Sequence, residues 1–465
     1  MPNQQIETIN PATGKPIAKY DIMSVDEIHK RVQNARLAQQ KWKTLDVSER
    51  SVYIRSLGRV LRKNKDEYAR LVTEEMGKPI RQANAEIEKC AWLCDYYSEH
   101  SESFLHDELV PTEFRKSFVS FEPLGIIAGI MPWNFPFWQA LRFAVPGLVA
   151  GNVEILKHSS VCLGSALKLE DAFKDAGFPE SVFQAVIGDS RVGEALILSQ
   201  IDAVSVTGSV TTGKRVAELA SRNLKKFVLE LGGSDPFIVL EDADLNQTAH
   251  MATQSRLLNT GQSCIAAKRF IVLKDVAEKF TNLFVENTEA EVLGDPMDSK
   301  TTVGPLVRES QREALARQLE DAKNKQATIL TGGKSLNRDG YFFEPTIVTD
   351  VKHEMDVVKE EVFGPAAPII VVNNEQEAIA EANNSEFGLG ASIWTNNVER
   401  GTRLARQIQS GIVSINEMVK SDPRMPFGGI KSSGIGRELS EFGIREFVNV
   451  KSIVVKDIAS KLLVE

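Results

Sequence analysis

Cysteine, histidine and excess basic charge are all scarce in this chain. Its 465 residues include four cysteines and six histidines, and 55 basic against 63 acidic side chains give a formal net charge of −8. Four cysteines are too few for a disulfide-stabilised scaffold of this length. An acidic balance argues against general binding to nucleic acids or anionic membranes. We therefore expect a reduced, cytoplasmic protein with no nucleic-acid or membrane partner.

Long hydrophobic runs are also missing. The most apolar stretch, residues 123–151, is interrupted by Pro132, Pro136 and Pro146, so it offers no unbroken span of about 20 apolar residues. The first twenty residues lack the apolar core of a secretory signal. Hydrophobic residues make up 42% of the chain and charged residues 25%, which is ordinary for a globular protein of several packed units.

Cys90 and Cys94 lie four residues apart, on one face of a predicted helix. A metal pair is conceivable there, but no CxxC or HxxxH motif accompanies it. We interpret both residues as buried thiols and expect no bound metal.

Two patterns of hydrophobicity follow one another along the chain. Residues 25–106 carry apolar positions at helical spacing and predict amphipathic helices. From residue 125 onward, short β-rich runs such as GIIAGI, NVEILK and AVSVT alternate with helical segments, and the alternation resumes after residue 235. Such alternation indicates parallel α/β sheets with crossover helices. We infer two α/β units that meet near residue 232.

The segment AVSVTGSVTTGKRVAELA gives a first local indication of function. It predicts a strand, a glycine turn and a helix, with Gly208 and Gly213 letting backbone amides approach an anion at the helix N-terminus. A P-loop needs Ser or Thr after Lys214 to hold magnesium, but Arg215 stands there, which disfavours a kinase or ATPase. A pyrophosphate turn of a dinucleotide site and a plain strand–helix turn both remain open.

Three further segments contain candidate catalytic residues, each with a structural alternative. Glu230 ends an apolar strand, where burial would suit it to general-base work, but Lys225 or Lys226 could simply pair with it. Cys264 follows the turn TGQS, which could present either a nucleophilic or a core thiol. Asn134, in MPWNFP, could donate to an oxyanion or cap the following helix.

Together these segments resemble the aldehyde dehydrogenase superfamily over nearly the whole chain. The order PWNFP, TGS, ELGG, GQSC, EEVFGP and PFGGIKSSGIGRE carries the resemblance. It implies an α/β fold with a Rossmann-like dinucleotide-binding domain, an α/β catalytic domain and a β-arm that forms homodimers or homotetramers. We assign residues 1–111 and 123–231 to the first, 232–433 to the second, and 112–122 with 434–465 to the arm and C-terminal segment.

The resemblance also implies roles for individual residues. Cys264 would be the nucleophile, Glu230 the base that activates the deacylating water, and Asn134 an oxyanion donor beside the Cys264 amide. The positions that match the family's cofactor site are Ile130, Met131, Trp133, Lys157, Ser160, Gly208, Ser209, Leu231, Glu361 and Phe363. The positions expected at the substrate are Arg142, Trp138, Ser421 and Phe427.

Within the superfamily, the sequence is most similar to succinate-semialdehyde dehydrogenases. This implies oxidation of a short aldehyde that bears a carboxylate, for which Arg142 would supply a guanidinium. Those enzymes use a second arginine just before the NTGQ motif, where this chain has Leu258, with Arg256 two residues earlier. The missing contact could come from a polar loop that contains Lys420, Ser421 and Arg424, unless that loop is simply solvated.

The cofactor is expected to be NADP, with NAD accepted. NAD-preferring relatives often carry a glutamate where this chain has Ser160, so a charge that would repel a 2′-phosphate is absent. Ala266 replaces the second cysteine of some relatives, so no regulatory disulfide is expected. The alternatives are a CoA-acylating member, which often lacks the glutamate of ELGG, a dehydrogenase for another short aldehyde, and a non-catalytic structural relative.

Overall fold

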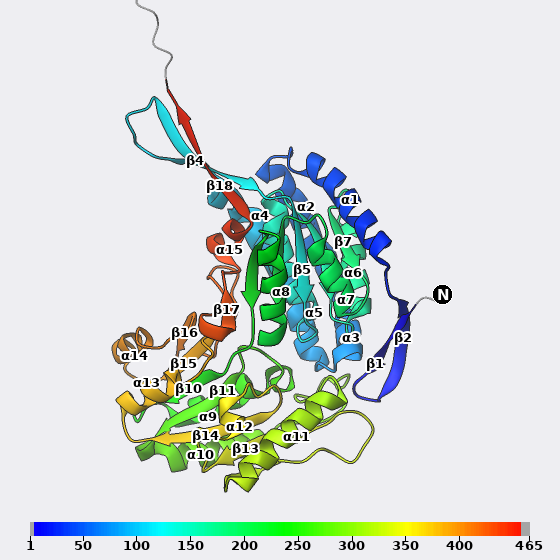
Figure 1. Cartoon of the computed structure of the whole chain (residues 1–465). Coiled ribbons are helices and arrows are strands. Elements are labelled where there is room, and N and C mark those ends of the chain that lie inside the picture. Colours follow the sequence, from blue (N-terminus) through cyan, green and yellow to red (C-terminus); the bar gives the residue numbers. More distant parts are fainter. Residues whose placement is uncertain (1–3, 457–465) are drawn as a thin grey trace, which may run out of the picture.

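Two parallel β-sheets, each covered by helices, lie one above the other in the molecule, and a β-ribbon projects from the upper one (Figure 1). This computed structural model describes residues 4–456. A hairpin near the N-terminus joins the side of the upper unit and consists of β1 (Gln5–Asn10) and β2 (Lys15–Asp21).

The upper sheet has the strand order β17-β9-β8-β5-β6-β7. Its strands are β5 (Ile126–Met131), β6 (Val153–His158), β7 (Phe183–Val186), β8 (Ala203–Thr207), β9 (Lys226–Glu230) and β17 (Gly434–Ile435). The chain enters at the central β5 and winds outward first to one side and then to the other. The five strands β5 to β9 are parallel, and β17 is antiparallel to β9. This is the Rossmann arrangement, so the expected α/β fold with a Rossmann-like unit is confirmed.

Helices cover both faces of the upper sheet, which explains why β6, β7 and β8 are buried along their whole length. One face carries α1 (Val25–Trp42), α7 (Ser190–Leu198) and α8 (Val210–Arg222). The other carries α5 (Pro136–Val149) and α6 (Leu163–Asp175), which are overlaid by α2 (Val47–Lys63), α3 (Lys65–Met76) and α4 (Ile80–Leu105). The helices predicted over residues 25–106 are therefore present.

The lower sheet has the strand order β12-β13-β14-β11-β10-β15-β16, parallel except for β12. Its strands are β10 (Asp235–Val239), β11 (Ala267–Leu273), β12 (Thr328–Thr331), β13 (Thr346–Thr349), β14 (Ala366–Val372), β15 (Gly390–Trp394) and β16 (Ile412–Ile415). The helical segments around it are α9 (Leu245–Leu257), η1 (Leu258–Gly261), α10 (Lys274–Glu289), α11 (Glu309–Asn324), α12 (Asp356–Lys359), α13 (Glu375–Asn383), α14 (Val398–Ala405) and η2 (Lys431–Ser433).

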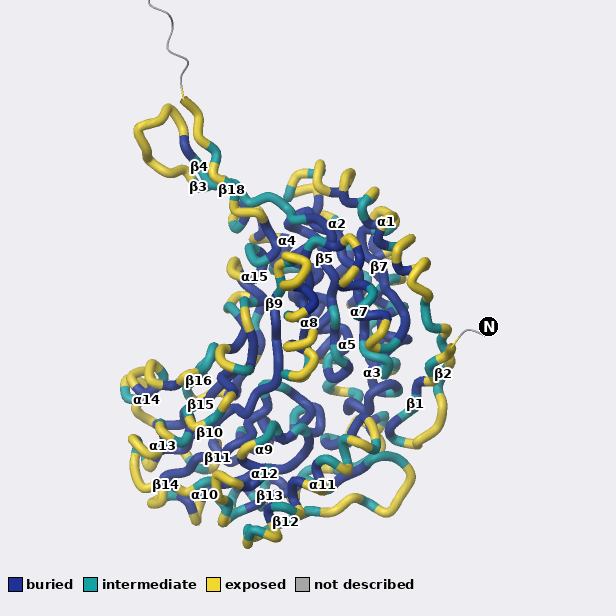
Figure 2. The backbone as a smooth tube through the Cα atoms, viewed as in Figure 1, coloured by how far each residue is buried: buried dark blue, intermediate teal, exposed yellow. Residues whose placement is uncertain are grey.

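The projecting ribbon is a three-stranded antiparallel sheet of β3 (Glu108–Leu109), β4 (Lys116–Pro123) and β18 (Val448–Val455). Figure 2 shows that it is largely exposed, and Val450 and Val454 on β18 are 61% and 54% exposed. Two short strands depart from the expected division of the chain. β3 belongs to this arm although it precedes residue 112, and β17 joins the upper sheet although it follows residue 433. Residues 457–465 of the expected C-terminal segment lie outside the described residues.

The helices of residues 4–456 include none that is both long and apolar enough to cross a membrane. Cys90 and Cys94 lie inside α4 with fully buried thiols, as predicted for core residues. In the same part of the chain, no group of three or more His, Cys, Asp or Glu side chains gathers as metal ligands would.

The C-terminal segment returns to the upper sheet and is bonded to both units. Asn152 is completely buried; its Nδ2 donates to the carbonyl of Phe447 at 2.9 Å, and its Oδ1 accepts from the Gly125 amide at 2.9 Å. Phe447 follows α15 (Ser440–Glu446), which packs on α4. Ser433 Oγ donates to the Gly232 carbonyl at 2.7 Å and accepts from the Gly388 amide at 2.9 Å, so it joins the exit of β9 to the entry of β15.

Replacing Asn152 by alanine should lower the free energy of unfolding by roughly 3 kcal/mol, because a buried N–H and a buried carbonyl both lose their partner. Urea unfolding followed by far-ultraviolet circular dichroism measures the change. The matched control is Asn34→Ala on the exposed side of α1, for which we expect a midpoint close to the parent's. Equal midpoints for both variants would contradict the role of Asn152.

Candidate active site

A cleft of about 830 Å³ opens between the two units, at the carboxyl ends of β5 and β8. The chain reverses its direction of winding between these strands, and open α/β sheets bind ligands at such points. All ten residues expected at the cofactor line the cleft: Ile130, Met131, Trp133, Lys157, Ser160, Gly208, Ser209, Leu231, Glu361 and Phe363. The rings of Trp133 and Phe363 meet edge to face across it, with centroids 5.7 Å apart.

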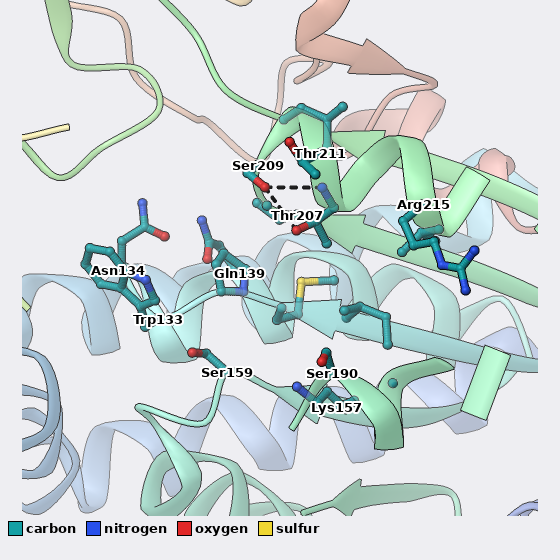
Figure 3. A pocket seen from close by; sticks show the side chains of 18 of the residues that line it. Trp133, Asn134, Gln139, Lys157, Ser159, Ser190, Thr207, Ser209, Thr211 and Arg215 are labelled. Carbon is teal, nitrogen blue, oxygen red and sulfur yellow. Dashed lines mark hydrogen bonds between the residues drawn. The ribbon is translucent and has the colours of Figure 1, made fainter. Parts of the chain in front are cut away.

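The N-terminus of α8 faces this cleft, as Figure 3 shows. Ser209 caps the helix, its Oγ accepting from the Thr212 amide at 3.2 Å. Gly213 serves a purpose other than the predicted approach to an anion, because a Cβ there would lie 2.5 Å from Leu231 side-chain carbons. It allows close packing of helix on strand. Arg215 lies at the far end of the cleft and pairs with Glu194 at 2.8 Å.

Lys157 and Glu361, two of the residues expected at the cofactor, differ in their surroundings. Lys157 points into the cleft (Figure 3), and burial lowers the pKa of its ammonium while Asp189 opposes this shift. Glu361 accepts from the Gly233 amide at 3.0 Å and lies 3.7 Å from Lys268 Nζ. Burial raises the pKa of Glu361, and the charge of Lys268 opposes it.

The turn that precedes Cys264 has an unusual backbone. Asn259, Thr260 and Gly261 are three successive residues in the left-handed region, with φ of 55°, 58° and 74°. Such a conformation costs on the order of 1 kcal/mol or more for a β-branched residue such as Thr260, so it persists only where its surroundings hold it. Here the Asn259 side chain donates to the Asn134 carbonyl at 2.8 Å, and Thr260 Oγ1 accepts from the Gly304 amide at 2.9 Å.

Two buried cations hold this turn through its carbonyl groups. Arg256, 1% exposed, donates to the carbonyls of Gly261 at 2.7 Å and Gly364 at 2.8 Å. Lys268, fully buried, donates to the carbonyls of Ser263 at 3.0 Å and Cys264 at 2.7 Å. Arg256 therefore faces the nucleophile turn and not a substrate carboxylate. The sequence analysis did not predict that Arg256 and Lys268 hold this turn. A usable signal was that both charged residues lie close in sequence to Cys264 and among apolar residues.

Cys264 is half-buried and lines the cleft. Burial raises the pKa of its thiol to about 12, while the charges of Arg142 and Lys268 pull it back. The resting thiol is therefore protonated near neutral pH, and these two cations are what favours the thiolate once a proton acceptor is available.

Asn134 is buried beside this turn, and its Nδ2 donates to the Gln262 carbonyl at 3.0 Å. It does not cap α5. That role belongs to Glu86 on α4, whose Oε1 accepts from the amides of Phe137 at 2.9 Å and Trp138 at 3.0 Å. The structure thus contradicts the capping interpretation, and the oxyanion role of Asn134 stays a prediction.

Glu230 is 1% exposed and does not line the cleft. Among the described residues, neither of its carboxyl oxygens has a hydrogen-bond partner. Burial raises the pKa of Glu230 well above its usual range and Glu438 raises it further, while Arg142 lowers it. Lys225 bonds to backbone carbonyls and Lys226 to Glu446, so the suggested pairing with a neighbouring lysine does not form.

The four residues expected at the substrate form a cluster apart from the cleft lining. Arg142 is 2% exposed, forms an ion pair with Glu438, and stacks its guanidinium 4.5 Å from the ring of Phe427. Its charge is thus already balanced, which differs from the free guanidinium that we expected for a carboxylate. Trp138 and Ser421 lie beside the ammonium of Lys89.

The polar loop before Phe427 divides into an inner and an outer part. Lys420 pairs with Glu417 at 2.9 Å and Arg424 with Asp422 at 2.6 Å, and both cationic side chains are more than half exposed. Only Ser421 points inward, with 6% exposure. The solvated-loop interpretation therefore holds for Lys420 and Arg424.

Comparison with known proteins agrees with this geometry. The sequence model of the aldehyde dehydrogenase family matches residues 1–453. The chain is 46% identical to a probable succinate-semialdehyde dehydrogenase [NADP(+)] of Synechocystis sp., over 96% of this chain and 99% of the relative. It is 42% identical to the succinate semialdehyde dehydrogenase [NAD(P)+] Sad of Escherichia coli K12, over 96% and 97%.

A solved structure, succinic semialdehyde dehydrogenase of Streptococcus pyogenes in complex with NADP+, superimposes with a TM-score of 0.95 at 35% identity. The match covers 97% of this chain and 100% of that one. The resemblance read from the six motifs is confirmed, and with it the fold. By sequence and fold, this chain belongs to the aldehyde dehydrogenase family.

Proposed function

We propose that this protein oxidises succinate semialdehyde to succinate with NADP as the preferred cofactor. The observation that carries the proposal is Cys264, held on a clamped turn at the wall of a dinucleotide-sized cleft. The relatives with the highest identity support the substrate, since they are named for succinate semialdehyde.

Cys264 begins the reaction in this proposal. Its thiolate forms a bond to the aldehyde carbon, and the carbonyl oxygen becomes an oxyanion that the Asn134 side chain and the Cys264 amide stabilise. A nicotinamide bound in the cleft supplies the hydride acceptor. The thioester that remains on Cys264 is attacked by water, whose proton passes to Glu230, and the acid leaves as the C–S bond breaks.

Glu230 suits the second half of this scheme better than the first. Its carboxyl group is neutral at rest because burial and Glu438 disfavour the charge. Since its oxygens have no bond to a described residue, the side chain can turn toward Cys264 without breaking one. Once its own proton has passed to solvent, a carboxylate with a raised pKa is a stronger base toward water than an ordinary one.

Replacing Asn134 by alanine should slow acylation by about 100- to 1,000-fold, because one oxyanion donor is lost. Stopped-flow absorbance of NADPH formation measures this step, and cofactor titration by protein fluorescence serves as the control that the cleft is intact. A parent-like acylation rate in a variant that still binds NADP would exclude Asn134 from this role.

Replacing Glu230 by glutamine should preserve the first turnover and block later ones. The amide keeps the size of the side chain but cannot accept the proton of the deacylating water, so kcat should fall by about 100-fold or more. The expected trace is a burst of one NADPH for each active site, followed by a slow phase. If the burst disappears as well, Glu230 acts before deacylation.

NADP is favoured by the charge balance at the edge of the cleft. Ser160 and Lys157 line it together, so a 2′-phosphate beside them would meet a hydroxyl and an ammonium; Asp189, whose charge acts on Lys157, also lines the cleft. The residues present therefore fit a phosphorylated dinucleotide.

A glutamate in place of Ser160 should lower kcat/KM for NADP by at least about tenfold through like-charge repulsion, while the value for NAD changes little. Steady-state assays with both cofactors measure this, and Ser160→Gln is the control for side-chain size. Equal losses for both cofactors in Ser160→Glu would show that residue 160 does not sense the 2′-phosphate.

A CoA-acylating activity is the alternative for the same cysteine. Glu230 favours hydrolysis, and analysis of products with and without CoA separates acid from thioester.

Self-association through the arm is also part of the proposal, supported by the exposed valines and free edge of β18. A reducing, cytoplasmic location is supported by four cysteines that are all free thiols.

A further inference from the structure

Lys89 on α4 is a cation that the scheme above does not use. The helix is held against the start of α5 by Glu86, which bonds to the amides of Phe137 and Trp138. Lys89 follows Glu86 by one turn, so its side chain runs beside Trp138 on α5. Its Nζ lies 4.1 Å from the centroid of the Trp138 ring and donates to Ser421 Oγ at 2.6 Å.

The positive charge of Lys89 has no carboxylate partner among the residues that the structure describes. The two acids that act on it most are already engaged: Glu86 in an ion pair with Lys78, and Asp422 in an ion pair with Arg424. An ammonium that is mostly removed from water and bonded only to a hydroxyl and a ring face would gain from an anion.

The groups around Lys89 are hydrogen-bond donors. The indole Nε1 of Trp138 is buried and has no acceptor within the described part of the chain. Ser421 Oγ accepts from Lys89 and can donate in turn. An orphaned N–H, a hydroxyl and an unpaired ammonium therefore meet in one place, which is the donor set that a carboxylate needs.

This place is close to the reacting sulfur. Trp138 directly precedes Gln139, and Arg142, one turn later on α5, donates to Thr207 Oγ1 at 3.3 Å; Gln139 and Thr207 line the same cleft as Cys264. Because Glu438 balances the charge of Arg142, Lys89 is the cation here that keeps its charge for a ligand. A four-carbon aldehyde is short, so its carboxylate must be recognised near Cys264.

We propose that Lys89 binds the carboxylate of the substrate, in place of the arginine that Leu258 replaces, with Ser421 and the Trp138 indole as neutral donors. Lys89 is thus a specificity-determining residue for semialdehydes. The inference rests on the proposed function and deepens it, since it concerns the same site.

Lys89 should make substrate preference depend on pH. Burial and the charge of Arg142 lower the pKa of Lys89 to about 8, against the opposing charges of Cys90, Asp422 and Glu86. The ammonium is therefore present below pH 8 and lost above it. The ratio of kcat/KM for succinate semialdehyde to that for butanal should fall above pH 8, and the titration of Cys264 cancels in this ratio. In Lys89→Arg the ratio should stay flat, because arginine remains charged.

The decisive experiment measures kcat/KM for succinate semialdehyde, glutarate semialdehyde and butanal in the full-length protein and three variants. Lys89→Met should lower the value for the preferred semialdehyde by roughly 10- to 100-fold and change that for butanal by less than about threefold, because only the charge-assisted bonds are lost. Lys89→Arg should recover most of the loss. Arg81→Met removes a positive charge from the exposed start of α4 and should leave all three values near the parent's.

The outcomes separate the two proposals. If the parent prefers succinate semialdehyde and Lys89→Met keeps that preference, the role of Lys89 is overturned and the proposed function stands. If the parent prefers glutarate semialdehyde and Lys89→Met abolishes the preference, the proposed substrate is wrong and Lys89 is supported. If the parent shows no preference over butanal, both fall. Unchanged butanal activity also shows that Lys89→Met is folded.

Discussion

The site depends on two buried cations that bond to backbone carbonyls around Cys264. Arg256 and Lys268 replace their lost hydration with the oxygens of the turn, and this fixes a backbone path that its own dihedral preferences oppose. Lys268 has a second effect on Cys264. It bonds to the backbone carbonyl of that residue, and its charge also favours ionisation of the thiol. Positioning and activation of the nucleophile thus come from one contact.

The surroundings of Cys264 consist of regions that differ in net charge. On one side, the dinucleotide cleft carries Lys157 and the start of α8. In the second region Arg142 and Glu438 neutralise each other, while burial and the charge of Glu438 keep Glu230 uncharged. This leaves Lys89 as a positive charge without a counter-ion in the cluster around Trp138. An anionic substrate completes the balance, whereas an uncharged aldehyde does not.

The sequence predicts well whatever is encoded locally. The strands at residues 126–131, 153–158 and 203–207 stand out because burial on both faces makes them rich in apolar residues, and Asn134 and Glu230 lie at or shortly after strand ends. Contacts between segments that are distant in the sequence could not be predicted from it. Lys89 meets Ser421 across 332 residues of sequence, and the balance of Arg142 by Glu438 has no local signature either. At Gly213 the sequence could not distinguish two reasons for a glycine, because close packing against Leu231 and approach of the backbone to an anion both require one.

The antiparallel strand β17 pairs its Gly434 with Glu230, so the last strand of the upper sheet comes from near the end of the chain. During synthesis, the edge of β9 therefore stays unpaired until residue 435 has left the ribosome. The arm strand β18 emerges only a few residues later. The surroundings of Glu230 and the projecting arm are consequently completed close together, and a product truncated before residue 434 can complete neither.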